Sequence, residues 1–181
     1  MAKDVKTMED LFLEEIRDLL DAEKQITKAL PKMAKAATSE ELSSAFVEHL
    51  EQTRGHIDRL ERIFTELGVK SGGVKCAGME GLLKEGDEMV SLTEAGPVRD
   101  AGLIAAAQRV EHYEMAGYGS ARTFAQLLGR DGAADLLQET LDEEKDTDEI
   151  LTEIAESMVN ERALAGSSPE RTGTAGSTGN Y

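Results

Sequence analysis

The segment QRVEHYEMAGYG, residues 108–119, places Glu111 and Glu114 three positions apart within a run that otherwise has the apolar pattern of a helix. With successive residues 100° apart, both glutamates fall on the same face as Ile104 and Tyr118, so both should point into a protein core. Carboxylates are almost never buried unless a partner compensates their charge. The pair therefore requires positive charge close by.

The other three predicted long helices also carry polar residues on their apolar faces. These are Glu23 on the first helix, His49, Thr53 and His56 with Gln52 at the edge on the second, and Glu144 and Asp148 on the fourth. All of them lie near the middle of their helices. Antiparallel packing of helices of similar length would therefore bring them to one level of the molecule.

The chemistry that fits this set is metal binding. Five carboxylates at one point would repel each other by several kcal/mol apiece, and no Lys or Arg lies at the centre of an apolar face to compensate them. Two divalent ions would supply the missing charge, as in the di-iron and di-manganese sites of helix bundles. Oxygen ligands with a minority of nitrogen favour Fe or Mn, and Zn is a third candidate. The predicted ligands are Glu23, His56, Glu111, Glu114, Glu144 and Asp148.

Two other interpretations fit parts of the pattern. A non-catalytic bundle would keep its inner carboxylates partly protonated or hydrated, with a degenerate or single metal site, and would act by dimerising or by binding other proteins. A ferritin-like storage cage is supported only by the acidic composition. The acidic residues Glu139, Glu143, Glu149 and Glu153 are predicted to form the solvated face of the fourth helix and to take no part in a site.

The elements that position these residues are four helices, predicted over residues 8–37, 40–67, 97–128 and 131–160. Residues 68–97 are rich in glycine and contain a short amphipathic piece, so they predict a long crossover between the second and third long helices. This connection makes those two helices parallel in an all-α four-helix bundle. The segment Thr38-Ser-Glu-Glu41 predicts a capping box at the turn between the first two helices.

Composition limits the class of protein. The chain of 181 residues with 40% hydrophobic residues suits one domain, predicted over residues 1–164, followed by a disordered tail of Gly, Ser and Thr over 165–181. A single cysteine, Cys76, excludes an intrachain disulfide, and the N-terminal segment lacks the apolar run of a signal peptide, so we expect a cytoplasmic protein. No apolar run is long enough to span a membrane. The net charge of -16 argues against nucleic acid and anionic lipid as partners.

Five segments of the chain resemble a known family. AEKQITKALPK, EHLEQTRGHIDRLE, KCAGMEGLLKE, LIAAAQRVEHYEMAGYG and LLQETLDEEKDTDEIL are similar, in this order, to the YciF-like stress proteins of the ferritin-like superfamily. The resemblance covers nearly all of residues 5–160. It implies a bacterial cytoplasmic four-helix bundle related to rubrerythrins, often a homodimer, that is linked to stress responses.

The resemblance also assigns site residues. Glu23, Glu111, Glu114 and Glu144 match the carboxylate positions of a rubrerythrin-like site, and Asp148 stands near a position where such proteins place a histidine. The second helix departs from the pattern, because the superfamily expects a glutamate followed three residues later by histidine. Here that pair is Thr53 and His56, with Gln52 where close relatives carry glutamate. Cys76, Met79 and Glu80 also match the family, without a known chemical role.

From these residues we expect two ions bridged by Glu111 and Glu144. Glu23, Glu114, Asp148 and His56 would be terminal ligands, with His49 or Gln52 in reserve. Ions about 3.5–4 Å apart would hold peroxide or O2 between them. The expected activity is therefore peroxide removal, of peroxidase or catalase type, or ferrous oxidation. Tyr118 would either hydrogen-bond such a ligand or act as an ordinary core tyrosine.

Overall fold

The computed structural model describes residues 4–166, and all regular secondary structure in this part of the chain is helical. Four long helices are present: α1 (Met8–Ala36), α2 (Glu40–Leu67), α4 (Pro97–Leu127) and α5 (Asp131–Ile154). A shorter helix, α3 (Ala77–Leu92), lies between α2 and α4 in the sequence. The prediction of an all-α fold is confirmed.

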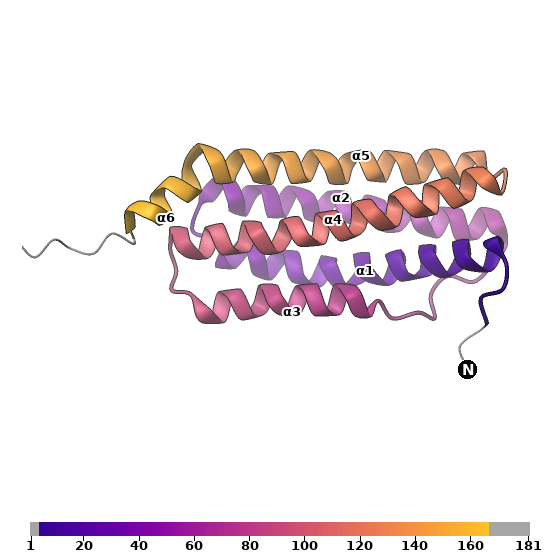
Figure 1. The fold of residues 1–181 in the computed structure, drawn as a ribbon, viewed down its shortest axis with the longest axis horizontal. Helices are drawn as coiled ribbons and strands as arrows, with labels where there is room; N and C mark the ends of the chain where they lie inside the picture. Colours follow the sequence, from indigo (N-terminus) through magenta and orange to yellow (C-terminus); the bar gives the residue numbers. More distant parts are fainter. Residues whose placement is uncertain (1–3, 167–181) are drawn as a thin grey trace, which may run out of the picture.

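The helices form a bundle with two tight hairpins and one long connection (Figure 1). Helices α1 and α2 make one hairpin, and α4 and α5 make the other. The crossover between them carries α3 back along the length of the bundle, where α3 packs against α1 and α4. Helices α2 and α4 therefore run in the same direction. The predicted four-helix bundle, with a short helix in its crossover, is confirmed.

Local sequence signals account for several helix ends. Thr7 and Asp10 form a reciprocal capping box at the start of α1. Gly68 ends α2 in the left-handed conformation, with φ of 66°, which glycine adopts without steric cost. Pro97 is the first residue of α4, where its missing amide hydrogen costs no helical bond. Helix α1 continues through Pro31 to its last turn, so this proline does not end the helix.

The predicted capping box at Thr38 is wrong. The N-cap of α2 is Ser39, whose hydroxyl accepts a hydrogen bond from the Leu42 amide at 3.4 Å. Thr38 instead donates from its backbone amide to Asp100 at 2.8 Å and from its hydroxyl to the same carboxylate at 2.5 Å. The Ser39 amide also donates to Asp100, at 2.9 Å. The buried Asp100 carboxylate thus ties the α1–α2 turn to the first turn of α4, a contact that no local pattern reveals.

Replacing Asp100 with alanine should destabilise the bundle by about 2 kcal/mol, because the amides of Thr38 and Ser39 lose their acceptor in a partly buried turn. For a domain of this size the melting temperature should fall by about 4–8 °C, measurable by calorimetry. Asp146→Ala, at an exposed position of α5, is the matched control and should melt like the unmodified protein. Equal melting temperatures for the two variants would contradict this role of Asp100.

The last predicted helix does not end near Asn160. A π-helical turn at Ala155–Val159 follows α5, and α6 (Asn160–Gly166) then continues the chain in a different direction (Figure 1). Helix α6 packs against α4 and extends to Gly166, beyond the domain boundary predicted at residue 164. The remainder of the predicted disordered tail, residues 167–181, lies outside the described residues.

The hydrophobic core is divided into two clusters. One contains, among others, Phe12, Leu60, Phe64 and Leu137, and the other contains Ile26, Leu42, Leu103 and Leu151. Along every long helix the members of the two clusters occupy opposite halves. Between them lies a layer of buried polar residues, near the middle of the bundle. The two apolar clusters therefore enclose the polar layer from both ends.

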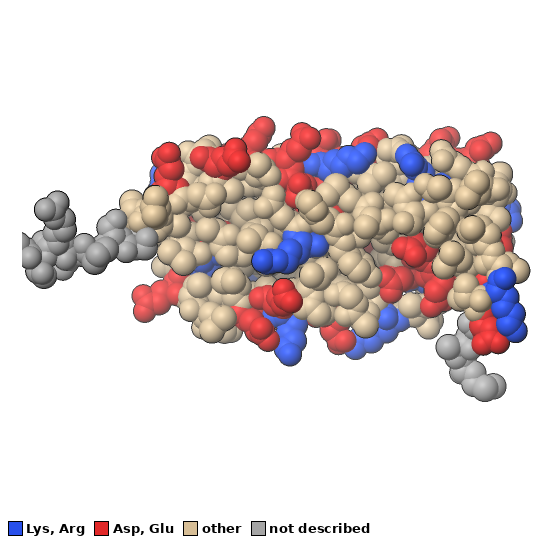
Figure 2. Space-filling view, in the orientation of Figure 1, with Lys and Arg blue, Asp and Glu red and all other residues tan. Residues whose placement is uncertain are grey.

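The surface of the described chain carries both signs of charge. Figure 2 shows acidic side chains along both long edges of the visible face, with Lys and Arg between them, and no continuous basic area on that face. Among the described helices, none combines the length and the apolar character that a membrane crossing requires.

Candidate metal centre

The polar layer gathers side chains from all four long helices. Glu23 of α1, His56 of α2, Glu114 of α4 and Glu144 of α5 are completely buried, and His49 and Glu111 are at most 3% exposed. The residues singled out at mid-helix thus meet at one level, as their spacing suggested. Asp148 is the exception among the predicted ligands.

Two groups of potential ligands share one carboxylate. His49, Glu111, Glu114 and Glu144 form the first group, and Glu23, His56 and Glu144 form the second. Within each group, one ligand atom from every residue lies within 4.8 Å of the others. Glu144 belongs to both groups, whereas Glu111, the other expected bridge, belongs only to the first. The layer therefore offers two adjacent positions for a cation with Glu144 between them.

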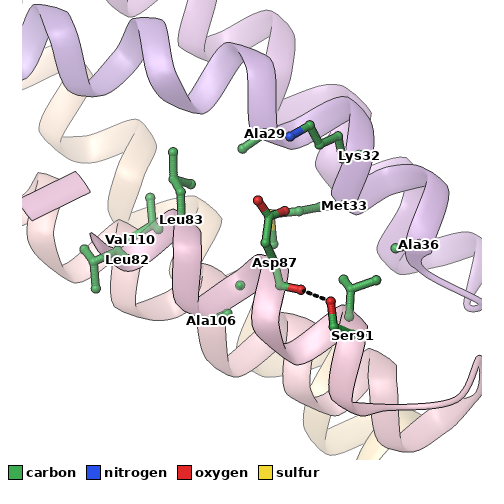
Figure 3. A pocket seen from close by; sticks show the side chains of 12 residues that line it. Ala29, Lys32, Met33, Ala36, Leu82, Leu83, Asp87, Ser91, Ala106 and Val110 are labelled. Atoms are coloured by element: carbon green, nitrogen blue, oxygen red, sulfur yellow. Dashed lines mark hydrogen bonds between the residues drawn. The ribbon is translucent and has the colours of Figure 1, made fainter. Parts of the chain in front are cut away.

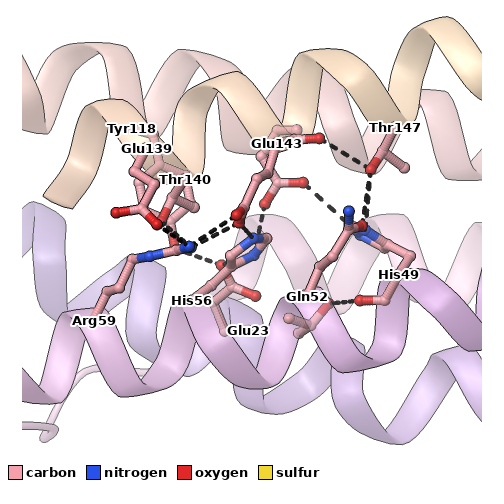
Figure 4. A network of polar contacts seen from close by, with 12 residues as sticks. Glu23, His49, Gln52, His56, Arg59, Tyr118, Glu139, Thr140, Glu143 and Thr147 are labelled. Atoms are coloured by element: carbon pink, nitrogen blue, oxygen red, sulfur yellow. Dashed lines mark hydrogen bonds and ion pairs between the residues drawn. The ribbon is translucent and has the colours of Figure 1, made fainter.

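His56 is oriented by partners on both sides of its ring (Figure 4). Its Nδ1 lies 3.2 Å from Glu23 Oε1 and 3.0 Å from Glu144 Oε1, while its Nε2 lies 2.8 Å from Glu143 Oε2. Nε2 donates a hydrogen bond to Glu143, so Nδ1 points at the two inner carboxylates. This is the arrangement in which a carboxylate fixes the tautomer of a metal-binding histidine.

Glu143 is therefore not part of the solvated face, and that prediction is wrong. Its carboxylate binds both terminal nitrogens of Arg59, at 2.7 and 2.8 Å, and its side chain is only 30% exposed. Arg59 also reaches Glu139 at 2.6 Å (Figure 4). The other residues assigned to that face, Glu139, Glu149 and Glu153, are exposed as predicted. The pattern along α5 alone carries no signal for this contact, because both partners of Glu143 lie on α2.

His49 repeats the arrangement at the other group. Its Nδ1 lies 3.2 Å from Gln52 Oε1 and 3.2 Å from the Thr147 hydroxyl. Its Nε2 faces Glu111 at 3.6 Å and Glu144 at 3.8 Å and has no hydrogen-bond partner. His49, which the sequence suggested only as a reserve ligand, is thus placed as well as His56, and Gln52 faces its ring. Thr147 was missed, although its position on the apolar face of α5, one turn before Leu151, was a usable signal.

The inner carboxylates are short of hydrogen-bond partners. Both oxygens of Glu114 and of Glu144, and one oxygen each of Glu23 and Glu111, are buried without a hydrogen bond among the described residues. Such atoms are rare in folded proteins because each loses its hydration without compensation. Their convergence on two unpartnered imidazole nitrogens fits a cation, which would bind these atoms directly.

Burial and mutual repulsion control the protonation of the layer. Burial, followed by repulsion from Glu144, raises the pKa of Glu111 and of Glu114 well above the ordinary value. Burial also raises the pKa of Glu23. Burial alone would lower the pKa of His56, but the neighbouring carboxylates of Glu144 and Glu23 raise it to about 10. Without a metal ion the layer therefore retains protons at neutral pH.

Tyr118 has a defined partner in the layer. Its buried hydroxyl donates to Glu23 Oε1, one of the potential ligand atoms. Burial raises the pKa of Tyr118 well above its ordinary value, so the hydroxyl keeps its proton. Tyr118 thus orients a candidate ligand, and in this structure its hydroxyl is satisfied by that contact.

Asp148 and Thr53 do not join the groups. Asp148 lies outside both groups, with Oδ2 3.4 Å from Nε2 of His112, an exposed side chain, and with Oδ1 buried and unpartnered. Thr53, at the position where the resemblance expects a glutamate, donates its hydroxyl to the carbonyl of His49 at 2.9 Å. The potential ligands gathered by the structure are therefore four glutamates and two histidines.

Cys76 has a structural role in the crossover between α2 and α4. Its Sγ accepts a hydrogen bond from the Met79 amide at 3.3 Å at the start of α3 and lies 3.0 Å from the Tyr113 hydroxyl. Its backbone amide donates to Asp21 of α1 at 2.8 Å. Cys76 and Met79 are both buried, whereas Glu80 is exposed and pairs with Lys75. These contacts fix α3 on the bundle and involve none of the candidate metal ligands.

A separate cavity of about 300 Å³ lies between α1, α3 and α4 (Figure 3). Its walls are mostly apolar, with Met33, Leu82 and Leu83 among them, and Lys32 and Asp87 lie at its exposed side. None of the candidate metal ligands lines it. This cavity is therefore distinct from the polar layer.

Residues 7–164 match the model of a family described as a domain of unknown function, DUF892. The chain is 50% identical over 160 residues to the protein YciF of Escherichia coli strain K12, and the match covers 88% of this chain and 96% of YciF. The crystal structure of the E. coli stress protein YciF superposes with a TM-score of 0.83, covering 86% of this chain and 99% of YciF.

Two further structures are similar. YcfI of Rhodopseudomonas palustris, described as a candidate structural protein, is 45% identical with a TM-score of 0.81, covering 84% of this chain and 97% of its own. A protein of Xanthomonas campestris pv. campestris shares 17% identity with a TM-score of 0.70, covering 88% of this chain and 99% of its own, and shows the fold alone. The resemblance inferred from the five sequence segments is thus confirmed, and this chain belongs to the DUF892 family together with YciF.

Proposed function

We propose that this protein binds two ions of Fe or Mn in its polar layer and uses them on a small oxygen species, peroxide or O2, or to oxidise Fe(II). The observation that carries the proposal is the set of buried, unpartnered carboxylate oxygens around two unpartnered imidazole nitrogens. The name of its relative, the E. coli stress protein YciF, supports a role under stress for this chain as well.

The two groups define which residues would hold each ion. His49, Glu111 and Glu114 would hold one, Glu23 and His56 the other, and Glu144 would contribute to both. Four carboxylates balance the four positive charges of two divalent ions, so the filled layer is neutral inside an apolar bundle. When bound, Fe or Mn supplies redox chemistry at this level of the core. Zinc would satisfy the same charge without redox activity.

The surrounding residues orient the ligands and hold protons. Tyr118 keeps its proton on the hydroxyl and directs it to Glu23 Oε1. Glu143, itself fixed by Arg59, accepts a hydrogen bond from Nε2 of His56 and so directs Nδ1 at the inner carboxylates, where a cation would replace its proton. Gln52 and Thr147 orient the ring of His49 in the same way. The chain thus orients both imidazole rings before a metal arrives.

The test is the metal content of protein expressed in iron- or manganese-supplemented medium, measured by mass spectrometry together with peroxide consumption and Fe(II) oxidation. About two ions of one redox metal per chain are expected, with turnover of at least one of these substrates. Less than about half an ion per chain in every medium would contradict the proposal, because the two groups would then lack the cations that they require.

Glu143→Ala should weaken metal binding about 10- to 100-fold without removing a ligand, because His56 loses the acceptor that fixes its tautomer. Competition with a fluorescent chelator measures the affinity. Glu139→Ala is the matched control, since Glu139 lies one turn away on α5 and also binds Arg59 but does not contact His56. Equal weakening in both variants would mean that the Arg59 ion pairs, and not the histidine contact, control the site.

A further inference from the structure

A cavity of about 30 Å³ lies between α2 and α5, and both exposed residues and candidate metal ligands line it. At its outer side lie Glu48, which is exposed, and Ile150, which is 43% exposed. At its inner side lie His49 and Glu111, both of which are buried. The cavity therefore connects solvent with two ligands of the first group.

The size of this cavity restricts what it can admit. A single water molecule needs about 10–15 Å³ of cavity volume, so a space of about 30 Å³ holds roughly two atoms of oxygen size. The larger cavity beside α3 has about ten times this volume but none of the candidate ligands in its walls. A substrate with a bulky organic group would therefore not reach the ligands through the α2–α5 cavity.

Much of the cavity wall is apolar. Ala45, Phe46 and Leu151 supply apolar surface, and the small side chain of Ala45 leaves the space open. Gln52 and Thr147 are the inner polar wall, but their oxygens already face Nδ1 of His49 (Figure 4). An uncharged molecule would therefore meet few competing polar contacts before it reaches the inner end.

The second group is covered differently. His56 is shielded by Glu143, whose carboxylate is held on two sides by Arg59. Glu23 and His56 do not line the α2–α5 cavity. The two positions for ions are thus unequal, and the one formed with His49 is the one that this cavity reaches.

We propose that the α2–α5 cavity is the entrance for an uncharged molecule with two oxygen atoms, hydrogen peroxide or O2, and that this molecule arrives at the ion held by His49, Glu111, Glu114 and Glu144. This inference rests on the proposed function, because it needs an ion in the first group. It adds a substrate class limited by size and assigns different tasks to the two positions: the first receives the substrate, and the second completes the ion pair away from the entrance.

The experiment uses nitric oxide, a two-atom probe that binds ferrous ions and changes their absorption spectrum. The metal content of the protein is measured first, and the rate of nitric oxide association is then followed by stopped flow on the iron-loaded full chain. Ala45→Leu should slow association roughly tenfold or more, because the added atoms fill a small cavity in a close-packed wall. Iron content and the final spectrum should stay unchanged. Ile150→Ala should speed association by widening the outer side.

Val47→Leu is the control, since Val47 is exposed on the same helix and does not line the cavity. Unchanged association in both Ala45→Leu and Ile150→Ala, with iron bound, would overturn the entrance and leave the proposed function standing. If Ala45→Leu fails to fold, Ile150→Ala decides the question by itself. An unmodified protein that binds neither iron nor manganese would overturn the proposed function, and the entrance with it.

Discussion

Glu144→Ala is expected to remove both metal ions, because Glu144 is the one carboxylate that both ligand groups share. The metal content should fall from about two ions per chain to nearly none. Metal at about 100 times its dissociation constant stabilises a folded protein by about 2.7 kcal/mol, which corresponds to a rise of about 5–11 °C in melting temperature for a domain of this size. That rise should be absent in Glu144→Ala, as mass spectrometry and calorimetry with and without metal would show.

Three further variants make this result specific. Glu23→Ala and Glu111→Ala each remove a ligand from one group only, so each should retain about one ion per chain. Glu149→Ala, at an exposed position of the same helix as Glu144, should retain both. If Glu144→Ala instead made the protein more stable and metal had no effect on either form, the layer would hold protonated acids and the non-catalytic bundle would be the correct interpretation.

The metal-free protein should lose thermal stability as the pH rises from about 5 to 9. Burial raises the folded-state pKa of Glu23, Glu111 and Glu114, so in this range the folded state keeps protons that the unfolded chain has released. Stability then decreases with increasing pH above the unfolded value of these carboxyls. The pKa of His56, raised to about 10, acts in the same direction between the unfolded value of about 6.5 and about 10.

Differential scanning calorimetry across this pH range measures the effect, with Glu114→Gln as the comparison. Glutamine has the shape of the protonated acid and cannot ionise, so the variant should match the unmodified protein near pH 5 and exceed its melting temperature near pH 8. Saturating metal should remove the difference in slope from the unmodified protein, because the ions replace the protons and bind more tightly as the pH rises. Identical slopes for the two metal-free proteins would show that Glu114 does not titrate in this way.

The sequence predicts the bundle well because each helix carries its own information. The apolar period of 3.6 residues indicates which face of each helix is buried, and residues such as Gly68 and Pro97 indicate where helices end or begin. The same period placed Glu23, Glu111, Glu114 and Glu144 inward, which the structure shows. Which face of a helix is buried is thus a local property, and the sequence of that helix alone is enough to predict it.

Contacts between helices are not local, and there the prediction was incomplete. Asp148 follows Glu144 by one turn, yet the position of α5 along α4 brings it to His112 instead of to the ligand groups. His49 joins the first group for the same kind of reason, since the axial position of α2 decides which of its polar residues meet Glu111. Asp100 acquires its role from a turn more than sixty residues earlier. Relative axial shifts of this kind are set by packing of the whole bundle.

The π-helical turn after α5 is a further case. Nothing in the sequence around Ala155–Val159 marks it, because the segment consists of ordinary helix formers. The π-helical turn changes the direction of the chain, so that α6 packs against α4. Such a turn depends on what the following residues can pack against, and this is known only once α4 is in place.

The separation of the hydrophobic core into two clusters has a consequence for how the protein unfolds. Each end of the bundle holds its own apolar cluster. Between the two clusters the helices contact each other through carboxylates and imidazoles, which repel each other or share protons when no cation is present. In the metal-free protein the two ends should unfold independently, so amide hydrogen exchange should give a different free energy of opening at each end. Bound ions would link the two ends into one cooperative unit. The exchange rates of backbone amides at the helix ends, far from any ligand, would then show whether the metal site is occupied.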